Sequence, residues 1–114
     1  MDLEWIRRCC LSFPHATEEV QWATDLVFKI GGKMFALAPT EPAPVALSFK
    51  CTIEEFAELV ERPGVIPAPY LARAHWVSLE TQDALPRAEL KRLLRQSYDL
   101  VFARLTKKMQ AKLR

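Results

Sequence analysis

The side chains best placed to bind a ligand are lysines in strand-like segments. Lys29 follows Phe28 in LVFK, and Lys50 follows Phe49 in LSFK. Ammonium groups bind phosphate oxygens, and small residues between the lysines would let a phosphate backbone approach closely. The pattern therefore predicts an anion-binding sheet face. The alternative is that these lysines only keep an exposed sheet soluble and discourage pairing between sheet edges.

Further candidates lie near these lysines in the expected fold. Lys33 is at a hairpin tip, where a basic residue can contact phosphate or a minor groove. Tyr70 and Trp76 could stack on a base, or equally serve as buried aromatic residues. The proline-rich segment 63–76 is long for a connector and could form one wall of a cleft. The full candidate set for a nucleic acid or another ligand is Lys29, Lys33, Lys50, Tyr70, Arg73, His75, Trp76, Lys107 and Lys108.

Catalytic and metal-binding patterns are not found in the sequence. No serine has the context of a nucleophile elbow, and no glycine-rich phosphate loop occurs. The two histidines and three cysteines have no zinc-ligand spacing, and Cys10 reads as a small hydrophobic core residue. We therefore expect a protein that is not an enzyme and needs no metal or cofactor. An enzyme that uses His75 is a minor alternative.

The Gly31-Gly32 pair between apolar runs predicts a β-hairpin, because glycine reaches the positive φ of a two-residue loop without steric cost. With that loop, Ile30 faces Lys33, Lys29 faces Met34, and Phe28 faces Phe35. One face of the hairpin is then apolar. The opposite face is predicted to carry Val27, Lys29, Met34, Ala36 and Ala38.

The remaining elements follow from periodicity, caps and prolines. Helices are expected over 2–13, over 52–62 with a Thr52–Glu55 capping box, and from Pro86 onward. A third strand is expected over 44–50 and another over 75–80, whereas 15–24 and 63–74 are expected to be irregular. The order α-β-β-β-α-β-α predicts a two-layer α+β fold, an antiparallel sheet with helices on one face. The first and last helices should cover the face that carries Phe28, Phe35, Leu47 and Phe49.

Length and composition are those of one globular domain over residues 1–114. Residues 87–114 hold nine of the sixteen Lys and Arg but only two of the fourteen Asp and Glu. A basic tail over about 105–114 results, which either suits the negative end of a helix dipole or attracts an anionic partner. No membrane-spanning or secretory segment is evident, and the odd cysteine count fits a reducing, cytoplasmic location.

Several segments in order carry a family resemblance: VFKIGGKMFAL, LSFKC, PGVIPAPYLARAHWV and SYDLV. Together they resemble the MmcQ/YjbR-like family of small bacterial proteins, from CLSFP at 10–14 to LTKK at 105–108, with a departure at Phe13-Pro14-His15. The resemblance implies a frataxin-like α+β fold and a DNA-binding role often assigned through a double-wing arrangement of hairpins. Frataxin-like proteins bind iron through acidic surface residues. In the first expected helix of this chain the only acidic residues are Asp2 and Glu4, which are too few for an iron site of that kind.

Two functional hypotheses follow. The first is a monomeric cytoplasmic module that binds nucleic acid weakly through the lysine-bearing sheet face, the hairpin and the segment 73–76. The second is a non-catalytic module that binds a protein or a small ligand in a cleft between the sheet and segment 63–76. A pocket at that place favours the second hypothesis, and a flat or convex basic surface would count against it.

Overall fold

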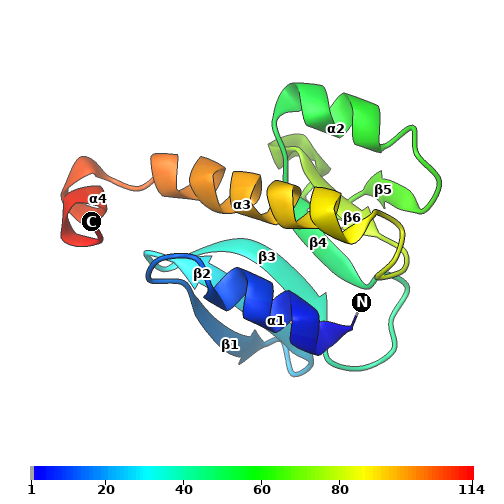
Figure 1. Cartoon of the computed structure of the whole chain (residues 1–114), viewed down its shortest axis with the longest axis horizontal. Helices are drawn as coiled ribbons and strands as arrows, with labels where there is room; N and C mark the ends of the chain where they lie inside the picture. The colour runs from blue at the N-terminus through cyan, green and yellow to red at the C-terminus, as the bar shows by residue number, and fades with distance from the viewer. Residues whose placement is uncertain (1) are drawn as a thin grey trace.

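Six strands form one antiparallel sheet in the order β1-β2-β3-β4-β6-β5, with helices packed against it (Figure 1). The computed structural model describes residues 2–114. The strands are β1 (Thr17–Gln21), β2 (Asp25–Ile30), β3 (Lys33–Pro39), β4 (Leu47–Lys50), β5 (Val65–Pro67) and β6 (Trp76–Leu79). The helices are α1 (Leu3–Leu11), α2 (Ile53–Leu59), α3 (Arg87–Ala103), α4 (Lys107–Lys112) and the 3-10 turn η1 (Ala72–Ala74). The predicted two-layer α+β fold is confirmed.

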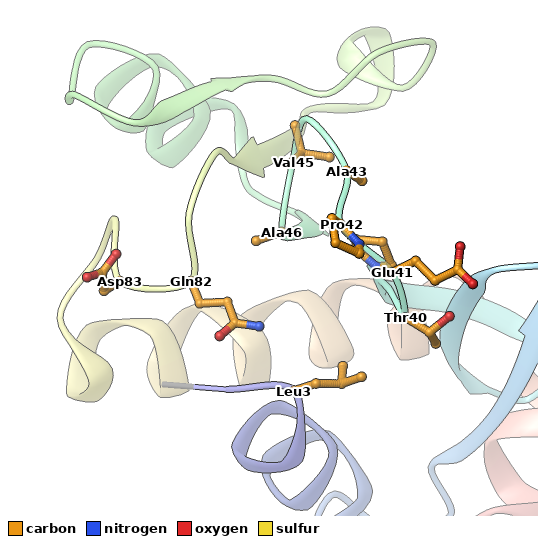
Figure 2. A pocket seen from close by; sticks show the side chains of 10 residues that line it. Leu3, Thr40, Glu41, Pro42, Ala43, Val45, Ala46, Gln82 and Asp83 are labelled. Atoms are coloured by element: carbon orange, nitrogen blue, oxygen red, sulfur yellow. The ribbon is translucent and has the colours of Figure 1, made fainter.

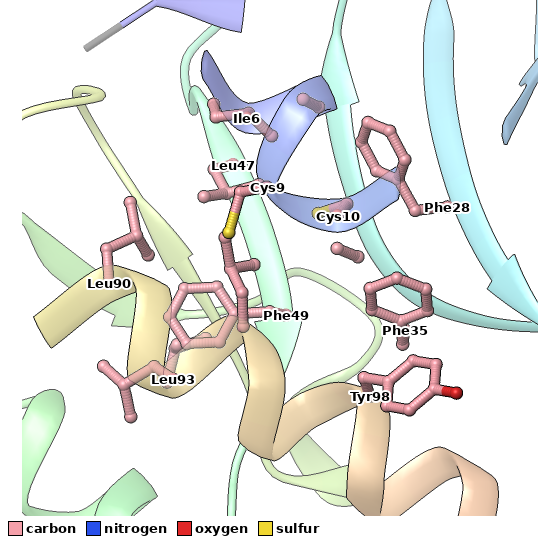
Figure 3. Packing of buried hydrophobic residues seen from close by; sticks show 14 of the residues in the cluster. Ile6, Cys9, Cys10, Phe28, Phe35, Leu47, Phe49, Leu90, Leu93 and Tyr98 are labelled. Carbon is pink, nitrogen blue, oxygen red and sulfur yellow. The ribbon is translucent and has the colours of Figure 1, made fainter. Parts of the chain in front are cut away.

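The core lies between the sheet and helices α1 and α3, as predicted. Figure 3 shows Phe28 and Phe35 of the sheet facing Cys10 of α1 and Tyr98 of α3. The rings of Phe35 and Tyr98 meet edge to face, with centroids 5.5 Å apart. Tyr98 also donates a hydrogen bond from its hydroxyl to the carbonyl of Pro14 at 2.7 Å. Burial of this apolar surface is the main force that holds the helices on the sheet.

The hairpin register is correct at the tip and wrong beyond it. Ile30 pairs with Lys33 and Lys29 with Met34, but a β-bulge then shifts the register, so Phe28 pairs with Ala36 instead of Phe35. One extra residue in β3 reverses the faces of the residues that follow it. Two alanines predicted for the open face, Ala36 and Ala38, therefore lie in the core. Leu37, which pairs with Val27, faces the other way.

A buried serine on α3 satisfies the backbone at this bulge. The Ser97 hydroxyl donates to the carbonyl of Phe35 at 2.5 Å and accepts from the N–H of Lys50 at 2.9 Å. Buried backbone groups that lose their ladder partner need another partner. Ser97 is fully buried, so it fixes the bulge and the end of β4 to the same turn of α3. The position of Lys50 is set by this contact.

Two further strands correct the expectation that residues 15–24 and 63–74 are irregular. β1 and β5 are the two edge strands of the sheet. β1 is polar, and its carboxylates are paired: Glu18 with Arg7 of α1, and Glu19 with Lys29 of β2. β5 is three residues long and ends at Pro67, which is tolerated because an edge strand can leave a missing N–H unpaired. Sequence patterns did not predict these strands, because β1 is polar and β5 contains a proline.

The basic C-terminal segment forms a short helix of its own, α4, at the end of α3 farthest from β5 (Figure 1). The Thr106 hydroxyl caps α4 by accepting from the N–H of Met109 at 3.1 Å. The predicted Thr52 cap of α2 is also present, with Thr52 accepting from Glu55 N–H at 3.1 Å. Within residues 2–114, no helix has the length and apolarity that crossing a membrane requires.

Candidate functional site: a basic pocket at the end of the sheet

Basic side chains from four parts of the chain surround one pocket of about 510 Å³. It lies where β3 and β6 begin and where β4 and α3 end. We call it the basic pocket, and its lining residues are Lys33, Met34, Lys50, Arg73, Ala74, His75, Trp76, Val101 and Arg104. Five of the nine candidates from the sequence are therefore brought together: Lys33, Lys50, Arg73, His75 and Trp76.

Lys50 is the most constrained cation of the basic pocket. Its Nζ donates to the carbonyl of Ala74 at 2.5 Å, which directs the side chain across the turn η1. Burial lowers the pKa of the Lys50 ammonium, and the nearby Arg104 guanidinium lowers it further. The pocket therefore has a positive potential that its own residues do not neutralise.

No carboxylate offsets this charge among the described lining residues. Within residues 2–114, none of Lys33, Lys50, Arg73 and Arg104 lies within ion-pair distance of an Asp or Glu. Five other basic residues, namely Arg7, Lys29, Arg62, Arg92 and Arg95, do form such pairs. Four cations without carboxylate partners therefore surround one concavity, and like-signed charges that line a cleft attract the opposite charge.

Trp76 and His75 form one wall of the basic pocket. Trp76 pairs with Lys50 across β4 and β6 and is only 5% exposed, so its ring is a fixed wall rather than a free stacking platform. His75 has a left-handed backbone (φ 64) where η1 ends. Its ring lies edge to face on Phe56 at 5.6 Å. That contact is with an apolar ring, which cannot exchange a proton with the imidazole.

The other four candidates from the sequence do not line the basic pocket. Lys29 lies on the outer face of the sheet but is ion-paired with Glu19 of β1. Tyr70 is fully exposed in the turn after β5, with φ at 65. Lys107 and Lys108 are exposed on α4, three and four residues beyond Arg104.

Arg104 is the functional candidate that the sequence reasoning missed. It caps the C-terminus of α3, three residues after Val101, and both residues line the basic pocket. The i, i+3 spacing places the two side chains on the same side of the helix, and this was the available signal. Using it required knowing that α3 ends beside the start of β6.

A second cavity, of about 490 Å³, lies between the loop after β3 and the N-terminus of α1. Figure 2 shows its two carboxylates, Glu41 and Asp83, on opposite sides and pointing away from one another. Its functional groups do not converge on a common point. We therefore place the candidate site in the basic pocket.

The three cysteines are free and buried. Burial raises the pKa of Cys51 to about 12 and also raises that of Cys10. Both thiols are therefore protonated and poor nucleophiles at neutral pH. In the part of the chain that the structure describes, no three His, Cys, Asp or Glu side chains gather closely enough to hold a metal ion.

Comparisons with known proteins agree with this architecture. A crystal structure of the Deinococcus radiodurans protein DR2400, with a DUF419 domain, is 32% identical and superimposes with a TM-score of 0.88, covering 98% of this chain and 87% of that one. A Pseudomonas syringae protein shares the fold at 20% identity and a TM-score of 0.70, over 88% of this chain and 98% of that one. The uncharacterised protein YbdF of Escherichia coli O157:H7 is 29% identical over 91 residues, 77% of this chain and 73% of that protein. The YjbR family model matches residues 11–100, and the chain belongs to the YjbR family.

Proposed function

We propose that this protein is a binding module that takes a phosphate-bearing ligand in the basic pocket. The observation that carries the proposal is the convergence of Lys33, Lys50, Arg73 and Arg104 without a carboxylate partner. Phosphate oxygens accept several charge-assisted hydrogen bonds, which are stronger than bonds between neutral groups. A bound phosphate would supply the negative charge that balances these four cations.

Nucleic acid is the first candidate ligand. Two exposed lysines, Lys107 and Lys108 of α4, follow Arg104 by three and four residues, which supports contact with more than one phosphate of a strand. Lysine and arginine contacts of this kind give affinity that is independent of sequence and depends on salt. A monomer that binds weakly in this way is the expected form.

A small phosphorylated ligand is the second candidate, and the shape of the site favours it. The basic pocket is a concavity of about 510 Å³, a size typical of small-molecule sites. Trp76 and Val101 give it apolar walls between the cations. A free nucleotide and the end of a nucleic-acid strand present the same phosphate chemistry to these walls.

Fluorescence anisotropy with labelled single-stranded and duplex DNA, at about 50 mM and about 200 mM salt, tests the first candidate. We expect Arg73→Gln/Arg104→Gln to weaken binding and to reduce the slope of log K against log salt by about 2 for duplex DNA. The matched control is Arg62→Gln/Arg92→Gln, which removes the same charge from paired arginines. Equal losses in both variants would contradict a site at the pocket.

Competition by a free nucleotide separates the two candidates. If the nucleotide displaces labelled DNA and binds the wild-type protein but not the Arg73→Gln/Arg104→Gln variant, the small ligand is the better description. Absence of binding by DNA and nucleotide at low salt would reject the proposed function.

A further inference from the structure

A second group of unpaired cations surrounds a separate pocket on the helical side of the molecule. The pocket has a volume of about 420 Å³ and lies between α1 and α3. We call it the interhelix pocket, and it is lined by Trp5, Arg8, Cys9, Ser12, Arg87 and Lys91. It shares no residue with the basic pocket.

Three of its six lining residues are cations, and none is an acid. Arg87 and Lys91 are four residues apart on α3 and therefore lie on the same side of that helix, and Arg8 faces them from α1. Among residues 2–114, no Asp or Glu lies within ion-pair distance of these three side chains. All three residues are exposed, so water screens their mutual repulsion, and a bound anion would reduce it further.

The carboxylates of the same two helices are engaged elsewhere. On α1, Glu4 pairs with Arg7, and on α3, Glu89 pairs with Arg62 of the segment after α2. Asp99 pairs with Arg95 one turn along α3. Rearranging a side chain to neutralise the interhelix pocket would therefore break an existing ion pair.

The walls of the pocket also hold its cations in place. The Arg87 guanidinium lies over the Trp5 ring, 5.6 Å from its centroid. The Ser12 hydroxyl donates to the carbonyl of Cys9 at 2.6 Å, so binding of an anion here rests on the three cations and not on this hydroxyl. Burial raises the pKa of the Cys9 thiol, and the Lys91 ammonium offsets part of that rise. An ordered guanidinium with a nearby ammonium suits a tetrahedral oxyanion.

We propose that the interhelix pocket is a second phosphate-binding site, in which Arg8, Arg87 and Lys91 bind the phosphate oxygens. The phosphate is either that of a small phosphorylated compound or one in a nucleic-acid strand. This site does not depend on the basic pocket, and either can fail without the other.

The three tryptophans allow the two sites to be measured separately in the intact chain. Trp5 lines the interhelix pocket and Trp76 lines the basic pocket, whereas Trp22 is an exposed residue of the turn between β1 and β2. In the NMR spectrum of a ¹⁵N-labelled sample, each tryptophan gives one indole N–H signal, which reports on the pocket or turn where that tryptophan lies. Pyrophosphate is the first probe, and a short single-stranded oligothymidylate is the second.

We expect pyrophosphate to shift the Trp5 signal saturably while the Trp22 signal stays fixed. Arg87→Gln/Lys91→Gln should weaken that binding about tenfold or more, because two charge-assisted bonds are lost. The control variant Arg62→Gln/Arg92→Gln loses the same charge from paired residues and should bind as the wild type does. Before any probe is added, unchanged Trp22 and Trp76 signals verify that both variants are folded.

The outcomes distinguish a small phosphorylated compound from a nucleic-acid strand, and they distinguish the interhelix site from the proposed function. A Trp5 shift with pyrophosphate alone identifies a small phosphorylated ligand, and a shift with oligothymidylate identifies a strand. A shift of Trp76 without Trp5 under both probes overturns the second site and leaves the proposed function standing. A Trp5 shift that persists in Arg87→Gln/Lys91→Gln, or that rises without saturation together with Trp22, also overturns it.

Discussion

Ser97 is the residue that fixes the two strands beside the basic pocket. It is fully buried, and it bonds the bulged strand β3 and the end of β4 at once. Replacement by alanine leaves the carbonyl of Phe35 and the N–H of Lys50 without this partner. We expect Ser97→Ala to lower the free energy of unfolding by about 1–3 kcal/mol, measured by urea denaturation.

Ser12→Ala is the matched control for that change. Ser12 also donates a hydrogen bond to a backbone carbonyl, but the residue is exposed, so water can replace the bond. Its loss should change the stability by less than about 0.5 kcal/mol. Equal effects of the two substitutions would show that the bulge does not need Ser97.

At the scale of single residues, sequence reasoning named five of the nine residues that line the basic pocket from local signals. Lys50, Arg73 and Trp76 stand at strand and turn positions that pattern alone identified. Sequence reasoning also grouped Lys29 with these pocket residues, because strand alternation does place Lys29 and Lys50 on the same sheet face. The Glu19 partner that occupies Lys29 belongs to a strand too polar to be recognised. Long-range pairing is not encoded in alternation.

Among the elements, the β2–β3 hairpin and the C-terminal segment fit together at a glycine. A Cβ atom on Gly31 would lie 2.7 Å from Cδ1 of Leu105, and Gly31 has φ at 59. Gly32 also has a positive φ, at 82, but faces open space. Gly32→Ala should therefore cost about 1 kcal/mol for the backbone alone, and Gly31→Ala a larger amount.

A double-mutant cycle with Leu105→Ala measures the extra cost. Removing the Leu105 side chain removes the closest contact and leaves Met109 Cγ at 3.3 Å, so most of the difference between Gly31→Ala and Gly32→Ala should disappear in that background. Thermal unfolding of the six proteins gives the comparison. A difference that persists undiminished without Leu105 would mean that backbone conformation alone distinguishes the glycines.

The contact between α1 and the edge strand β1 is an ion pair that responds to pH. Arg7 donates two hydrogen bonds to the Glu18 carboxylate and thereby lowers the pKa of Glu18. A lowered carboxyl pKa in the folded state stabilises the protein above the unfolded pKa of about 4.3, and the effect is lost as pH falls through the folded value. Arg7→Leu should therefore lower the free energy of unfolding at pH 7.

That difference should shrink as the solution is acidified and vanish once Glu18 is protonated in both states. Urea denaturation at pH 7 and at about pH 2.5 tests this sign. Arg8→Leu is the control on the neighbouring position, because Arg8 has no carboxylate within ion-pair distance among residues 2–114. A constant difference between Arg7→Leu and the wild type at both pH values would contradict the ion pair.

Elements could be predicted where one segment holds the whole signal. The Gly31-Gly32 turn, the Thr52 cap and the apolar stripe of α3 are of this kind. The β-bulge could not be predicted, because the side chain that bonds its backbone belongs to Ser97, which lies 62 residues away from Phe35 in the sequence. Nor could β5, whose three residues acquire strand character only by pairing with β6. Tertiary partners decided these elements.

Across the whole molecule, the basic residues up to Arg104 divide into those paired with carboxylates and those that line the two pockets, whereas the four at 107–114 belong to neither group. Arg62 is paired with Glu89, whereas Arg104 of the basic pocket is unpaired and repels Lys50. The two kinds should respond to neutralisation with opposite signs. At low ionic strength, Arg104→Gln should stabilise the ligand-free protein by up to about 0.5 kcal/mol, and Arg62→Gln should destabilise it by a similar amount.

Salt gives the second test of this division. Because salt screens exposed charges, both differences should decrease as the ionic strength rises from about 0.01 M to about 1 M. Differential scanning calorimetry of the wild-type protein and the two variants at these limits measures the signs directly. If Arg104→Gln destabilised the ligand-free protein at low salt, Arg104 would have a stabilising partner, and the basic pocket would not need an anion to balance its charge.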